Sequence, residues 1–253
     1  MLYKKLVIFL CPLLIFGGLE LLFYKSDLIY FSIVAIPIIL LIFLKIIIKE
    51  KFFSLDFWGL ATLPLLLLFS TIGLLFLLNS DLFSHLIMII FALVLGLYLE
   101  NIFQFYYLPA HYQPHSLENF SSFLGLLIFF LFTVDLNAFY VFLNIPIWVL
   151  SLILIFILTL ILLQAFWINK IEGKLRFVYL FTIDIIILQF FWALSFLPAN
   201  FYVSSIILTI FLYFIWGIIK QKLSEKMEKR IIWQYLIISI ILLVFIIITS
   251  AWT

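Results

Sequence analysis

The sequence predicts an all-α, polytopic integral membrane protein, a bundle of about nine transmembrane helices with the N-terminus inside and the C-terminus outside. Composition is the first observation behind this class. The chain of 253 residues is 68% hydrophobic and 10% charged, whereas soluble domains carry about 25% charged residues. The second observation is that the apolar residues fall into runs of about 20, the length that crosses a bilayer. The placement of the basic residues, the third observation, sets the number of spans and their direction.

Nine apolar segments follow one another along the chain. The first resembles a signal peptide, because Lys4 and Lys5 precede its apolar run, but no small-x-small cleavage site follows, so we expect an uncleaved span. The predicted spans cover residues 6–24, 28–48, 57–78, 83–105, 120–142, 146–168, 177–197, 203–219 and 231–251. Together they form a single transmembrane domain over residues 1–253, interrupted by a central polar loop, residues 106–119.

Lysine and arginine are distributed unevenly between the two sides that these spans define. With the N-terminus inside, all but one of the 14 basic residues fall in cytoplasmic segments, and the exception is Lys25. Because cytoplasmic loops are enriched in Lys and Arg, this distribution supports nine spans. We therefore expect a multi-pass protein of a cell membrane, the cytoplasmic membrane of a bacterium. A net charge of +2 does not indicate nucleic acid, so the expected partners are the lipid bilayer and a protein partner or second copy.

The fifth span has an acidic residue in its second half. Either its helix ends near Val134 and an outer loop follows, or the helix continues with Asp135 inside the membrane. The short apolar run before Asp135 favours the outer end of the span. Asp27, Asp81 and Asp135 also recur at intervals of 54 residues, as in a repeated helix hairpin. Short-looped hairpins show this spacing without duplication as well, because Asp is common at turns.

The central loop contains the candidate metal ligands. His111 and His115 are four residues apart and Glu118 follows three residues later, a ligand spacing if the segment were helical. Pro114 lies between the histidines and opposes a regular helix through both. The alternative is an interfacial loop without metal. The loop has no Lys or Arg. The sequence offers no physical reason for this, unless the loop is re-entrant.

Polar side chains inside the spans are the other candidate functional groups, because hydrocarbon penalises them. Glu100 and Gln104 share one helix face at the inner end of the fourth span, and they would line the central loop if it were re-entrant. Asp184 lies about seven residues into the seventh span. It either relays a proton or cation or forms a hydrogen bond to a neighbouring helix.

Three functions are open on this basis. We favour a non-enzymatic membrane subunit or scaffold that packs against partners, because the loops are short and paired charges within the spans are scarce. The first alternative is a transporter or channel for a small solute or lipid, which Asp184 and the prolines of the first three spans would serve. The second is an intramembrane metal-dependent hydrolase or transferase using His111 and His115. We assign no catalytic residue and expect no cofactor.

Overall fold

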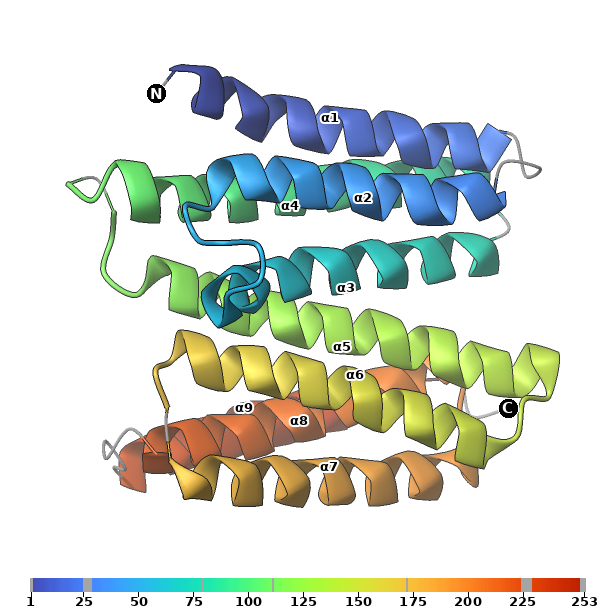
Figure 1. The fold of residues 1–253 in the computed structure, drawn as a ribbon. Coiled ribbons are helices and arrows are strands. Elements are labelled where there is room, and N and C mark those ends of the chain that lie inside the picture. The colour runs from blue at the N-terminus through green and yellow to red at the C-terminus, as the bar shows by residue number, and fades with distance from the viewer. Residues whose placement is uncertain are drawn as a thin grey trace. The chain divides into compact units, whose positions relative to one another are not determined.

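The computed structural model describes residues 2–24, 29–78, 80–110, 112–171, 173–223 and 229–250, and these ranges contain nine helices and no strand (Figure 1). Eight of these helices are long and apolar enough to cross a membrane, and α2 adds a shorter apolar run, Ile33–Ile47. The predicted class, a polytopic helical membrane protein, is therefore confirmed. The helices are α1 (Leu2–Tyr24), α2 (Ile29–Ile47), α3 (Leu55–Leu77), α4 (Asp81–Tyr107), α5 (Ser116–Leu143), α6 (Ile147–Ile168), α7 (Lys174–Ser195), α8 (Phe201–Leu223) and α9 (Lys229–Thr249).

The helices divide into two compact units. Unit 1 is residues 1–124, with α1 to α4 and the start of α5, and unit 2 is residues 125–253, with the rest of α5 and α6 to α9. Within unit 1, α1 packs against α2 and α4, and α3 packs against α4 (Figure 1). Within unit 2, α7 packs against α6 and α8, and α9 packs against α8. Each unit therefore positions its own polar groups.

The helices of unit 1 alternate in direction, which brings the start of α1 and the ends of α2 and α4 together. Lys4 Nζ donates a hydrogen bond to the Tyr107 hydroxyl, and that hydroxyl donates to the Ile47 carbonyl at 3.0 Å. Lys49 Nζ donates to the Tyr106 carbonyl at 2.8 Å. We call this cluster of Lys4, Lys49, Tyr106 and Tyr107 the basic end of unit 1. Its lysines lie on the side that the positive-inside rule assigns to the cytoplasm.

Aromatic side chains join neighbouring helices within each unit. In unit 1, Tyr98 of α4 is fully buried and its hydroxyl donates to the Leu60 carbonyl of α3 at 2.9 Å. In unit 2, the rings of Phe190 and Phe211 stack with centroids 4.0 Å apart and join α7 to α8. Offset-stacked rings stabilise beyond their buried area, so these contacts help fix which helices are neighbours.

The non-helical part of the central loop is shorter than the predicted residues 106–119. Helix α4 continues to Tyr107 and α5 begins at Ser116. The residue before α5, His115, has a φ of 62°, outside the helical region. Glu118 lies in the first turn of α5, where a carboxylate is stabilised by the positive end of the helix dipole. These two features place the helix start four residues before the predicted fifth span.

Helix α5 does not end near Val134, so that alternative from the sequence is wrong. It continues to Leu143, and Asp135 lies within it with 4% of its surface exposed. The helix continues because apolar residues still cover its later turns and its backbone remains hydrogen-bonded. Asp81 and Asp135, which are 54 residues apart, therefore do not occupy equivalent positions. Asp81 is the first residue of α4, whereas Asp135 lies within α5. Asp27 lies outside the described residues.

A serine side chain caps the start of α3 with a hydrogen bond. Ser54 Oγ accepts a hydrogen bond from the Phe57 N–H at 3.2 Å, whereas Ser80 before α4 makes no side-chain bond of this kind. Loss of a serine N-cap costs about 1 kcal/mol. We expect Ser54→Ala to lower the free energy of unfolding by about that amount, and Ser80→Ala to leave it unchanged, in thermal unfolding of the detergent-solubilised chain. Equal effects of both substitutions would contradict this assignment.

Candidate functional site

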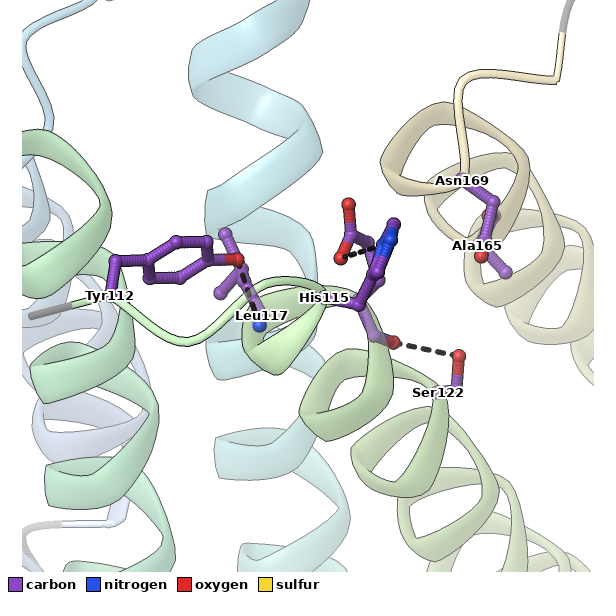
Figure 2. Close-up of polar contacts among 7 residues, drawn as sticks. Tyr112, His115, Leu117, Ser122, Ala165 and Asn169 are labelled. Atoms are coloured by element: carbon purple, nitrogen blue, oxygen red, sulfur yellow. Dashed lines mark hydrogen bonds and ion pairs between the residues drawn. The ribbon is translucent and has the colours of Figure 1, made fainter. Parts of the chain in front are cut away.

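The central loop forms local contacts that organise the start of α5 (Figure 2). The Tyr112 hydroxyl accepts a hydrogen bond from the Leu117 N–H at 3.1 Å. His115 Nδ1 lies 3.0 Å from Glu118 Oε2, and Ser122 Oγ donates to the Glu118 carbonyl one turn later. Burial, with a contribution from the Glu118 carboxylate, raises the pKa of the Tyr112 hydroxyl, while the Leu117 N–H acts in the opposite direction. These contacts satisfy groups at a helix start.

The metal hypothesis is only partly covered by the described residues. His115 and Glu118 contact each other, but His111 lies outside the described residues. Within the described ranges, no three His, Cys, Asp or Glu side chains are arranged to hold a metal ion. A metal site at His111, His115 and Glu118 therefore stays a prediction.

Positive charge reaches the central loop from other helices. Lys4 of α1 and Lys49, which follows α2, donate to Tyr107 and Tyr106 at the start of the loop. Both ammonium groups also lie 4.5 Å from the centroid of the Tyr107 ring. Two lysines from elsewhere in unit 1 therefore lie against the start of a loop that itself has no Lys or Arg.

Glu100 and Gln104 share a face of α4, as their spacing predicted. Gln104 Nε2 donates a hydrogen bond to Glu100 Oε1 at 3.3 Å. Glu100 also lines an apolar groove of about 460 Å³ between α1 and α4. On a neighbouring face, Asn101 Oδ1 accepts from Ser116 Oγ at 2.6 Å and joins α4 to α5. In the described part of the chain, no hydrogen bond or ion pair joins the Glu100 pair to the His115 pair, so the candidates predicted from the sequence form two separate pairs.

Asp184 is the candidate whose surroundings are most specific. It lies in the middle of α7 and is 4% exposed. Thr159 of α6 donates its hydroxyl hydrogen to Asp184 Oδ2 at 2.9 Å. The other carboxyl oxygen, Oδ1, is buried and has no hydrogen-bond partner within the described chain. Buried polar atoms are almost always hydrogen-bonded, so Asp184 Oδ1 is the atom of this site that is free to accept a further hydrogen bond.

A groove of about 370 Å³ lies between α6 and α7 beside this carboxyl. Among the residues that line it, Asp184 and Thr159 are the polar ones, and the others are apolar: Ile155, Leu163, Phe177, Leu180, Phe181, Ile185 and Leu188. Phe181 and Ile185 are 63% and 54% exposed, so the groove opens at the surface of unit 2. The arrangement can accept an apolar group that carries one hydrogen-bond donor or a cation.

Unit 2 contains further polar contacts between helices that the sequence did not reveal. Asn137 Nδ2 of α5 donates to Ser205 Oγ of α8 at 2.9 Å. Trp192 Nε1 of α7 donates to Ser151 Oγ of α6 at 2.6 Å. Asp135 lies near Asn137 in sequence, but its Oδ1 is buried without a partner in the described structure. Polar pairs of this kind join helices in hydrocarbon, where small hydroxyl and amide groups act as interhelical donors and acceptors.

A pair at the other end of unit 1 was also missed. His85 Nδ1 of α4 lies 2.8 Å from Glu20 Oε1 of α1, and the Phe23 ring flanks the imidazole. A signal for this pair is present in the sequence. Glu20 is the fifth residue from the end of α1 and His85 is the fifth residue of α4, so antiparallel neighbours would bring them to the same depth.

Comparison with known proteins identifies one family. The family described as "Protein of unknown function (DUF5656)" has a model that matches residues 50–249. This segment includes the central loop and the groove beside Asp184, and it ends with α9. No curated protein and no solved structure matches the chain.

Proposed function

Because the chain belongs to the DUF5656 family, whose function is unknown, we propose a function from its own residues. It is a non-enzymatic subunit of a membrane protein complex, and a transmembrane helix of a partner packs over the groove between α6 and α7 and places side chains in it. The observation that carries this proposal is Asp184 Oδ1, a buried carboxyl oxygen without a donor beside an open and otherwise apolar groove. The donor comes from the partner helix.

The chemistry of the groove favours a helix over other occupants. A dissolved solute needs several polar groups to replace its water, and here Asp184 and Thr159 are the polar residues of the lining. A hydrocarbon chain would leave Asp184 Oδ1 unpaired. A helix with one Ser, Thr, Asn or Lys among apolar residues satisfies both the apolar lining and the carboxyl. The interhelical hydrogen bond itself contributes about 0.6 kcal/mol and sets the register of the partner helix. Removing the carboxyl would in addition leave the partner's donor buried without an acceptor, which costs about 1–3 kcal/mol.

Photo-crosslinking in the native membrane tests this proposal. A photo-reactive amino acid at Ile185, in the groove, is expected to form a discrete protein adduct whose yield Asp184→Leu lowers. The matched control is Leu152 of α6, which is 62% exposed and does not line the groove, and it should not give the same adduct. Adducts with phospholipid alone at Ile185, or a protein adduct unaffected by Asp184→Leu, would contradict the proposal.

A further inference from the structure

A second groove, between α1 and α4 of unit 1, has the character of a binding site for a hydrocarbon chain. Its volume is about 460 Å³ and Glu100 is the one ionisable residue in its lining. Phe9 and Leu93 in the lining are 64% and 63% exposed, so the groove opens at the surface of the unit. Gly96 lies opposite Pro12, where an added Cβ would meet Pro12 Cγ at 3.5 Å. This is an ordinary van der Waals distance, so alanine would fit here and only a larger side chain would fill the groove.

The basic end of unit 1 carries two ammonium groups that point to the same ring. Lys4 and Lys49 Nζ each lie 4.5 Å from the Tyr107 centroid. Their hydrogen bonds go to the Tyr107 hydroxyl and the Tyr106 carbonyl, which are neutral groups. The carboxylates of Glu50 and Asp56 also act on the hydroxyl of the neighbouring Tyr106, so acidic groups lie near the two lysines. Two positive charges sharing one ring repel each other, and a bound anion would relieve this repulsion.

The basic end continues the groove. Lys4 lies one turn before the groove residue Ile8 on α1, and Tyr107 lies two turns beyond Glu100 on α4. At about 1.5 Å per residue, these separations are roughly 6 and 10 Å along the helix axes. Lys5, four residues before another lining residue, is exposed. The apolar groove therefore leads toward the two lysines of the basic end of unit 1.

From this juxtaposition we propose that unit 1 binds one anionic phospholipid. A hydrocarbon chain lies between α1 and α4, and the phosphate lies at Lys4 and Lys49. Charge complementarity selects an anionic headgroup over a neutral one, by about five-fold for each lysine near the phosphate. Glu100 lies on the groove just below the headgroup and opposes the negative phosphate, so it limits the affinity.

Native mass spectrometry of the purified full chain tests the proposal, with phosphatidylglycerol and phosphatidylcholine of identical chains as probes. We expect the unsubstituted chain to prefer phosphatidylglycerol. The double substitution Lys4→Gln with Lys49→Gln should lower its affinity by about 25-fold, five-fold per lysine, and leave phosphatidylcholine unaffected. Lys222→Gln is the matched control, because Lys222 of unit 2 lies 5.5 Å from the ring of Tyr179 and should not change the preference.

Two further variants distinguish binding of the lipid's hydrocarbon chain from binding of its headgroup. Gly96→Phe places a ring in the groove and should lower the affinity for both lipids equally. Glu100→Gln removes a negative charge near the phosphate and should raise the affinity for phosphatidylglycerol several-fold. Excess inorganic phosphate should not displace the lipid, because it has no chain to bury. The proposal fails if the lysine double variant keeps its preference or Lys222→Gln loses as much. It also fails if Gly96→Phe and Glu100→Gln have no effect, or if free phosphate displaces the lipid.

Discussion

Asp184→Leu is expected to raise the stability of the isolated chain and to weaken assembly with the partner helix. The carboxyl is buried in the middle of α7, and Oδ1 has no donor within the described chain. Leaving a buried polar atom unpaired costs about 1–3 kcal/mol, and leucine at this position has no such atom. The free energy of unfolding should therefore increase by about 1–3 kcal/mol, measured by thermal unfolding in detergent. The same variant should give less of the protein adduct at Ile185, because the partner's donor no longer has an acceptor.

Thr159→Val is the control for this prediction. It removes the hydroxyl that donates to Asp184 Oδ2 but keeps the carboxyl, so both carboxyl oxygens would then be buried without a donor. The free energy of unfolding should fall by about 1–3 kcal/mol. The two substitutions should therefore have opposite effects on stability, even though each removes one side of the same Thr159–Asp184 hydrogen bond. A carboxyl kept for structure alone would give the reverse result: Asp184→Leu would destabilise the chain and assembly would be unaffected.

The spans could be predicted from the sequence, but their packing could not. A span is recognisable because hydrocarbon requires a long apolar run, whatever surrounds it. In a soluble helix, an apolar stripe also identifies the buried face. Here both faces are apolar: Leu40 of α2 is fully buried, while Ile42, two residues later, is 56% exposed. Residue type therefore does not predict which face of a helix packs against another helix and which face is exposed.

The candidate site could be predicted in part for a related reason. Asp184 is visible in the sequence because an acid in an apolar run is costly. Its partner Thr159 lies 25 residues away on another helix, and only the packing of α6 on α7 brings the two together. The central loop shows the same limit. Its lack of basic residues was visible, but its contacts with Lys4 and Lys49 depend on the packing of three helices.

Gly217→Ala is expected to loosen the attachment of α9 to α8. A Cβ at Gly217 would lie 2.5 Å from Tyr235 Cε1, far closer than atoms can approach without movement. The Tyr235 ring also lies 5.2 Å from the Tyr213 ring, so it can move only by giving up this contact. Overpacking costs about 1–3 kcal/mol. Thermal unfolding in detergent should show a loss of this size, because among the described residues of α9 only Ser239 is buried and few other contacts can compensate.

Gly17→Ala is the matched control, because nothing lies within 4 Å of a Cβ at Gly17. Alanine is the better helix former by about 1 kcal/mol, so this substitution should stabilise the chain by up to that amount. Tyr235→Ala in the Gly217→Ala background removes the ring that the new methyl group meets, and it should recover part of the lost stability. The prediction would be wrong if both glycine substitutions changed stability in the same direction, or if Tyr235→Ala recovered none of the stability lost in Gly217→Ala. The close approach of α9 to α8 at Gly217 would then not contribute to holding them together.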